Sequence, residues 1–219
     1  MSRMNGIKQV IHQWAWVLLV AFCFIGLIYP IIGALALICM LAPAVVAFFK
    51  GRMWCGNFCP RGSFNDIILA KFSAKGKMPT FLSRTWFRVA FLIGLMTAFA
   101  AQLVLAWGNP SAVGRVFVRM ILITTLLTII LGLIYKPRTW CTFCPMGTLA
   151  YFVSKLQSSK LRGNQIRFNR EACINCNVCS KNCPININVL GFKAEGSVAD
   201  PNCLRCGVCV AKCPKKALS

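Results

Sequence analysis

Acidic residues are nearly missing from this sequence of 219 residues. Aspartate and glutamate together occur 4 times, whereas lysine and arginine occur 25 times, which gives a formal net charge of +21. In a soluble protein this excess would suggest nucleic-acid binding. Here the basic residues lie beside long apolar runs, a pattern that orients membrane proteins and holds them against anionic lipid. We therefore expect membrane lipid, and no nucleic acid, as a partner.

Histidine is also scarce, because His12 is the only one in the chain. A single histidine excludes a haem held by two histidines of this chain. The sequence lacks a glycine-rich loop of the phosphate-binding kind, so nicotinamide binding is not expected. Carboxylates are equally thinly spread, since Asp66 is the only one before Glu171.

Apolar residues, in contrast, make up 58% of the chain, and the mean hydropathy is +0.66. Four apolar runs have roughly the 20 residues that a helix needs to cross a bilayer. They are Val10–Tyr29, Ile31–Phe49, Phe87–Trp107 and Val116–Tyr135. The first two nearly touch, so Tyr29, Pro30 and Gly33 predict a tight hairpin between them. Residues 1–157 are thus predicted to form an all-α membrane domain of four transmembrane helices in two hairpins.

The charges of the connecting segments predict an orientation. The segment between the second and third runs is rich in basic residues, whereas the turn near Pro30 has none. The basic residues are Lys50, Arg52, Arg61, Lys71, Lys75, Lys77 and Arg84. By the positive-inside rule the N-terminus, this segment and the C-terminal tail face the cytoplasm. The prediction is a multi-pass protein of the cytoplasmic membrane of a prokaryote.

The two predicted hairpins end in the same motif. Residues 50–63 and 136–148 both read K-x-R-x-W-C and then F-C-P-x-G-[ST], with one residue fewer between the cysteines of the second copy. We interpret these motifs as two cysteine loops, 51–64 and 137–148. Each is followed by a mixed apolar stretch, 65–72 or 149–156, which is expected to form a short helix on the membrane surface.

Fourteen cysteines occur, and twelve of them form pairs or longer runs with metal-ligand spacing. The sequence shows no signal-peptide cleavage pattern, so a disulfide framework is not expected. Twelve ligands divide into three sets of four. Only Cys23 and Cys39 stand alone.

The C-terminal tail holds two complete C-x2-C-x2-C-x3-C-P runs. In such runs the first three cysteines bind three corners of one [4Fe–4S] cluster, and the fourth binds the other cluster. The spacing therefore predicts two crossed ligand sets. One is Cys173, Cys176, Cys179 and Cys213, and the other is Cys203, Cys206, Cys209 and Cys183. Zinc is the alternative metal, but it does not account for the two C-P endings and the additional ligands.

The remaining paired thiols are Cys55, Cys59, Cys141 and Cys144, at the predicted cytoplasmic ends of the second and fourth runs. If the two hairpins pack about a pseudo-two-fold axis, the four thiols meet at one place and could hold a third [4Fe–4S] cluster. Two alternatives stay open: each pair binds metal together with a partner subunit, or the thiols are reduced and lie in structural turns.

The composition becomes polar from about Ser158, and Gly163 and Asn164 suggest a linker. Residues 158–219 are therefore expected to form a separate cytoplasmic domain. Over roughly Phe168–Ser219 the tail resembles bacterial two-cluster ferredoxins. The resemblance implies a small α+β ferredoxin-like fold with two [4Fe–4S] clusters and one-electron transfer.

The order of parts over nearly the whole chain resembles a second group of proteins. These are the membrane-bound polyferredoxins of the periplasmic nitrate reductase quinol-oxidising type, and related membrane proteins that serve nitrous oxide reductase. They share paired transmembrane C-x3-C-P motifs followed by a cytoplasmic two-cluster domain, although Cys141 and Cys144 here form C-x2-C. The resemblance implies anaerobic respiratory electron transfer between the quinone pool, or a membrane partner, and a separate redox enzyme.

His12 and Asp66 are candidates for a proton relay. His12 lies near the predicted cytoplasmic end of the first run, where it could accept a proton from a quinol or be a plain interfacial histidine. Asp66 follows the first cysteine loop, where it could relay protons or pair with Arg61 or Arg52.

Three functions are compatible with the sequence. The first is an electron-relay subunit of an oxidoreductase complex, with other membrane or peripheral redox subunits as partners. The second is a quinone oxidoreductase that is catalytic in its own right and binds a quinone. The third is a redox sensor or assembly factor, which would need an output domain that the sequence does not reveal.

Overall fold

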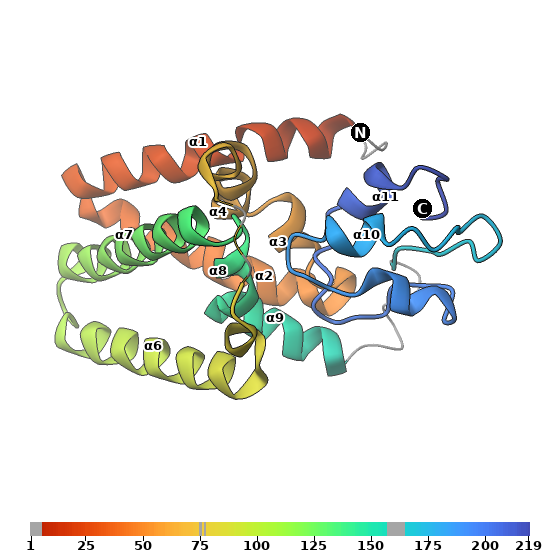
Figure 1. Cartoon of the computed structure of the whole chain (residues 1–219). Coiled ribbons are helices and arrows are strands. Elements are labelled where there is room, and N and C mark those ends of the chain that lie inside the picture. The colour runs from red at the N-terminus through yellow and green to blue at the C-terminus, as the bar shows by residue number, and fades with distance from the viewer. Residues whose placement is uncertain (1–5, 75, 77, 157–164) are drawn as a thin grey trace.

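The computed structural model describes residues 6–74, 76, 78–156 and 165–219 (Figure 1). The predicted linker at Gly163 and Asn164, the domain boundary between residues 157 and 158, and the basic residues Lys75 and Lys77 lie outside the described residues.

Four helices in the described part of the chain are long and apolar enough to cross a membrane. They are α1 (Gly6–Ile28), α2 (Ala36–Lys50) with the preceding 3₁₀ turn η1 (Pro30–Leu35), α6 (Thr85–Leu105) and α7 (Pro110–Ile134). Large apolar side chains along them are exposed, for example Leu18 at 67% and Val104 at 70%. Such surfaces suit contact with lipid, and the chain is a membrane protein with the four predicted spans. The side on which each end lies stays a prediction.

The first hairpin turns through η1, which packs against the beginning of α7. A Cβ atom at Gly33 would lie 2.3 Å from the carbonyl oxygen of Gly114, and one at Gly114 would lie 1.9 Å from that of Pro30. Only glycine allows two backbones to come this close, as at many helix contacts in membranes. These two residues therefore join the two hairpins at the end far from the cysteines.

The predicted cysteine loops are short helices. Their bounds are α3 (Met53–Asn57) and α4 (Pro60–Phe64) in the first copy, and α8 (Thr139–Phe143) in the second. The C-P dipeptides explain these breaks, because Pro60 and Pro145 each begin a new helix, a position where proline is favoured. The two predicted surface helices follow, as α9 (Pro145–Leu156) and as the π-helical segment η2 (Asn65–Leu69) with α5 (Ala70–Phe72). A 3₁₀ turn, η3 (Thr80–Ser83), precedes α6.

The tail consists of tight turns and short helices. These are α10 (Val178–Lys181), the 3₁₀ turn η5 (Val189–Lys193) and α11 (Val208–Lys212). The predicted β part is not confirmed, since pairing within residues 165–219 is limited to two isolated antiparallel bridges, Arg167 with Ser197 and Phe168 with Leu218. Left-handed residues such as Asn175 and Arg205 turn the chain within the cysteine runs, which leaves little length for strands.

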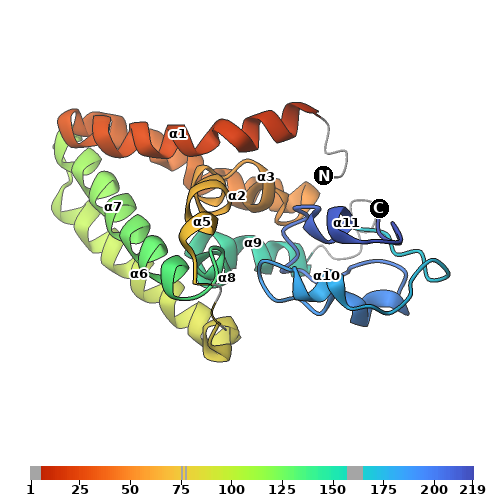
Figure 2. The same cartoon turned by 45° about the horizontal axis from the view of Figure 1, so that its top comes forward.

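The tail lies at the end of the membrane helices where α1 begins and where α3 and α9 are found. Figures 1 and 2 show α10 and α11 beside these elements from two directions. The tail therefore faces the two cysteine motifs of the membrane domain.

Candidate metal centres

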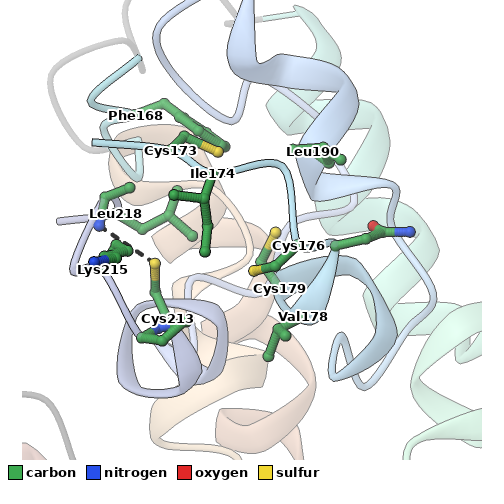
Figure 3. A pocket seen from close by; sticks show the side chains of 13 residues that line it. Phe168, Cys173, Ile174, Cys176, Val178, Cys179, Leu190, Cys213, Lys215 and Leu218 are labelled. Carbon is green, nitrogen blue, oxygen red and sulfur yellow. Dashed lines mark hydrogen bonds between the residues drawn. The ribbon is translucent and has the colours of Figure 1, made fainter. Parts of the chain in front are cut away.

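The first cysteine set of the tail surrounds a small apolar cavity. Cys173, Cys176, Cys179 and Cys213 all line it, together with apolar side chains such as Phe168 (Figure 3). The backbone N–H of Ala217 donates to Cys213 Sγ over 3.3 Å. Three of these cysteines come from one run and the fourth from the other, which is the grouping that crossed ligation requires.

The second set is arranged in the same way. Cys183, Cys203, Cys206 and Cys209 line another cavity, and the N–H of Ile187 donates to Cys183 Sγ over 3.3 Å. Burial, together with the neighbouring thiols, raises the pKa of Cys203 and of Cys209 to about 12. Thiols held together in this way favour a bound metal that accepts their charge as they lose protons.

The four cysteines of the membrane domain also meet. Cys55, Cys59, Cys141 and Cys144 line one apolar cavity of about 240 Å³, which continues between the membrane helices. Burial raises the pKa of Cys55 to about 11 and that of Cys59 to about 12, and thiols of the other half contribute to both shifts. The structure therefore brings the two cysteine pairs together within one chain.

The donor chemistry of all three sets fits a soft, thiolate-bound metal. Among the described residues, no three cysteine, histidine or acidic side chains are grouped closely enough to hold one metal ion. Four cysteine sulfurs around each cavity match the four-cysteine ligation of a [4Fe–4S] cluster. The assignment of the twelve ligands stays a prediction.

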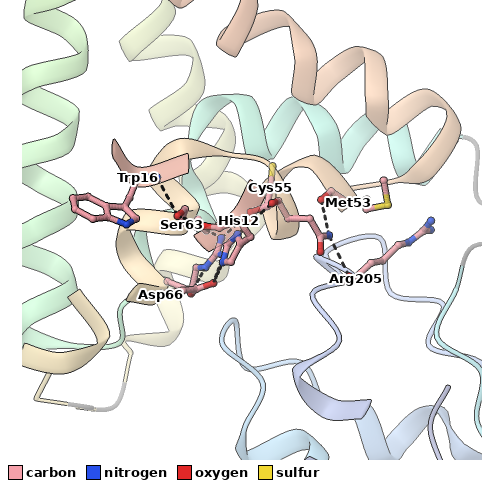
Figure 4. A network of polar contacts seen from close by, with 10 residues as sticks. His12, Trp16, Met53, Cys55, Ser63, Asp66 and Arg205 are labelled. Carbon is pink, nitrogen blue, oxygen red and sulfur yellow. Dashed lines mark hydrogen bonds and ion pairs between the residues drawn. The ribbon is translucent and has the colours of Figure 1, made fainter. Parts of the chain in front are cut away.

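His12 and Asp66, the candidate proton relay, lie in direct contact outside the membrane-edge cavity (Figure 4). His12 Nε2 is 3.1 Å from Asp66 Oδ2, and His12 Nδ1 is 3.2 Å from the carbonyl oxygen of Asn57. Arg138 binds the same carboxylate with two nitrogens, at 2.7 Å and 2.5 Å. Their role in proton transfer stays a prediction.

The expected pairing of Asp66 with Arg61 or Arg52 is wrong. Arg61 donates to the hydroxyl of Thr124 over 2.9 Å, and Arg52 donates to the carbonyl oxygen of Cys141 over 2.7 Å. Asp66 pairs with Arg138 instead, because the arginine of each motif copy extends into the other half of the molecule. The matching positions of Arg52 and Arg138 in the motif were the available sequence signal for this exchange.

Replacing Asp66 by asparagine is expected to destabilise the protein at neutral pH. Burial alone would raise the pKa of Asp66, but Arg138 and His12 outweigh it and lower the pKa to about 2 from a usual 3.8. The stabilisation is therefore complete above about pH 4 and is lost as the pH falls toward 2. We expect a loss of roughly 1–3 kcal/mol at pH 7, less than for a fully buried pair, since the carboxylate is 35% exposed.

Unfolding midpoints in detergent, measured for the natural protein and Asp66→Asn between pH 7 and pH 3, test this expectation. The difference between the two proteins should shrink as the pH is lowered. A difference of the same size at every pH would contradict the assigned ion pair.

The tail contacts the membrane domain at the first cysteine motif. A Cβ atom at Gly56 would lie 2.1 Å from the carbonyl oxygen of Leu204, which sits between Cys203 and Cys206. Arg205 Nη1 donates to the carbonyl oxygen of Lys50 over 2.9 Å. Leu204 also shares a buried apolar cluster with Cys55. The second tail set and the membrane-edge set are therefore neighbours.

A second contact lies beside the first. Arg88 Nη1 of α6 donates to Asn202 Oδ1 over 2.8 Å, and Asn57 Nδ2 of α3 donates to the carbonyl oxygen of Arg205 over 3.4 Å. Sequence reasoning predicted none of these contacts, because each joins residues about 100 or more positions apart.

Comparison with known families identifies two kinds of domain. Residues 32–79 and 118–164 match a 4Fe–4S binding domain, and residues 165–214 match a 4Fe–4S dicluster domain. The first match falls on each copy of the repeated motif, and the second covers both tail runs.

Three curated proteins are similar to the chain over most of its length. An uncharacterized protein of Methanocaldococcus jannaschii is 26% identical, over 80% of this chain and 66% of its own length. The "Putative electron transport protein YccM" of Escherichia coli is 29% identical, over 73% and 49%. The "Methylamine utilization ferredoxin-type protein MauN" of Paracoccus denitrificans is 26% identical, over 82% and 59%.

The chain thus spans about half to two thirds of the length of these relatives. No solved structure matches it significantly.

Proposed function

We propose that this iron–sulfur electron-transfer protein is a membrane-bound relay subunit with three [4Fe–4S] sites. A [4Fe–4S] cluster held by four cysteines supplies one-electron oxidation and reduction. The distal site would use Cys173, Cys176, Cys179 and Cys213. The proximal site would use Cys203, Cys206, Cys209 and Cys183, and the membrane-edge site would use Cys55, Cys59, Cys141 and Cys144.

The observation that carries this proposal is the contact of Gly56 with Leu204. In this contact Leu204, which lies between two proximal ligands, packs against Gly56, which lies between two membrane-edge ligands. In this proposal the three sites act in series from the tail to the membrane, with the proximal site between the other two. Apolar side chains around each set exclude water, and the backbone N–H groups of Ile187 and Ala217 orient two ligand sulfurs.

The relay would connect a redox partner at the tail with a membrane partner or the quinone pool. The tail and the start of α1 share one end of the molecule (Figure 1), and we propose that this end faces the cytoplasm. The partner enzyme would be another subunit of an oxidoreductase complex.

Catalysis of quinone reduction or quinol oxidation is a second candidate, and the apolar cavity of about 240 Å³ beside the membrane-edge cysteines favours it. His12 and Asp66 are not among the described residues that line this cavity. A quinone there would need a different route for its protons, so the relay is the better supported function.

Anaerobic purification with iron and sulfide analysis tests the relay. We expect about twelve iron atoms per chain, whereas about eight would contradict the membrane-edge site. The chemically reduced chain is then mixed with a short-chain quinone. A relay that needs a partner should stay reduced, and rapid reoxidation by the quinone would favour the catalytic alternative.

A further inference from the structure

The two arginines of the repeated motif reach across the molecule. Arg52 and Arg138 occupy the same position in the two copies, and each is 1% exposed. Arg52 Nη2 donates to the carbonyl oxygen of Cys141 over 2.7 Å, and Arg138 Nη1 donates to that of Cys55 over 2.7 Å. Each arginine thus holds the first cysteine of the other half.

The motif glycines make room for this exchange. A Cβ atom at Gly62 would lie 2.7 Å from Arg138 Nη1, and one at Gly147 would lie 2.6 Å from Arg52 Nη2. The arginine of one copy therefore fits against the glycine of the other. The K-x-R-x-W-C part of each copy and the C-P-x-G part of the other thus form one crossed clamp between the two halves.

The two arginines differ in their charge balance. Arg138 is neutralised by Asp66, but the structure gives Arg52 no ion pair within the described residues. Its other contact is the carbonyl oxygen of Asn202 at 3.4 Å, and its Nε has no partner. A buried, unpaired guanidinium costs several kcal/mol unless a counter-charge is nearby.

The counter-charge can come from the cavity that Arg52 lines. Four thiolates around a [4Fe–4S] core give a site of roughly −2. The second basic residue in this wall is Arg61, whose guanidinium also lies 5.7 Å from the ring centre of Trp140. The cations beside the two tail sets are more exposed to solvent. Lys193 donates to the carbonyl oxygen of Cys173 over 3.1 Å, and Arg205 lies between Cys203 and Cys206. Both side chains are only partly buried, whereas Arg52 is 1% exposed.

We propose that Arg52 and Arg138 are positioning residues of the membrane-edge site. In this proposal the unpaired charge of Arg52 raises the reduction potential of the membrane-edge site above the potentials of the two tail sites. This inference rests on the proposed function, since it presupposes a cluster at that site. A positive charge in a buried wall favours the reduced, more negative state. The membrane-edge site is then the first of the three to be reduced, and electron flow from the tail toward the membrane is favoured.

The test is an anaerobic redox titration followed by electron paramagnetic resonance, with full-length protein in detergent. The membrane-edge signal is the one that Cys55→Ser removes. The variants are Arg52→Gln, which removes the positive charge, and Arg52→Lys, which keeps the positive charge but lacks the planar guanidinium group. Arg84→Gln, at an exposed arginine, is the matched control.

In the natural protein the membrane-edge signal should appear first during reduction. At a fixed potential, Arg52→Gln should lower the ratio of reduced to oxidised membrane-edge sites roughly tenfold. This corresponds to a decrease of about 59 mV in the reduction potential for one electron. Arg52→Lys and Arg84→Gln should shift it much less, and all variants should keep about twelve iron atoms.

An unchanged potential in Arg52→Gln would overturn the charge role. A loss of iron in both Arg52 variants would overturn it too, because it would leave Arg52 a purely structural residue. A natural protein with only about eight iron atoms would contradict the membrane-edge cluster itself, which separates failure of the proposed function from failure of this inference.

Discussion

Replacing Cys55 and Cys141 together by serine is expected to reduce the iron content from about twelve to about eight atoms per chain. The two residues are the first cysteines of the two motifs, and both line the membrane-edge cavity. Serine is a poor ligand for a soft iron–sulfur core, so one ligand would be lost from each half. The tail sites draw no ligand from this cavity, so their iron and their spectra should persist.

Cys39→Ser is the matched control for this experiment. Cys39 lines the same cavity but belongs to α2 and has no paired cysteine in the motif. It should retain all the iron. The three-site proposal would be contradicted by a double variant that keeps twelve iron atoms, or by a Cys39→Ser protein that loses four.

Local patterns predicted the parts of this molecule that depend on short stretches of chain. The four spans were found because apolar length is a property of 20 consecutive residues. The grouping of Cys173, Cys176 and Cys179 follows from a spacing of six residues. The addition of Cys213 to that group came from a known rule of crossed ligation, and the structure places the four around one cavity.

Contacts between distant segments could not be predicted in the same way. The matching positions of Arg52 and Arg138 in the two motifs were the one local signal, and by themselves they did not favour Arg138 over Arg61 as the partner of Asp66. The choice depends on how the two halves pack, and the crossed clamp places Arg138 beside the first half. The strands that the family resemblance implies for the tail are not confirmed, and the left-handed backbone of Asn175 and Arg205 turns the chain within the cysteine runs.

Replacing Gly56 by valine is expected to interrupt the relay while leaving its metal sites in place. The added side chain would meet the backbone carbonyl of Leu204, which cannot rotate away as a flexible side chain could. The tail must then shift from its seat on α3. Since small misplacements of reacting groups can cost roughly a hundredfold in rate, we expect electron transfer between tail and membrane-edge sites to slow by roughly tenfold to a hundredfold.

Rapid mixing with a soluble one-electron donor, followed by freezing and electron paramagnetic resonance, would measure this transfer. Gly94→Val is the matched control, because Gly94 lies in α6 and a Cβ atom there meets nothing within 4 Å. Iron content should stay near twelve in both variants, which separates a displaced tail from a lost cluster. Equal transfer rates in Gly56→Val and in the natural protein would mean that electrons do not cross at Leu204. That result would contradict the proposed order, in which electrons pass through the proximal site between the distal site and the membrane-edge site.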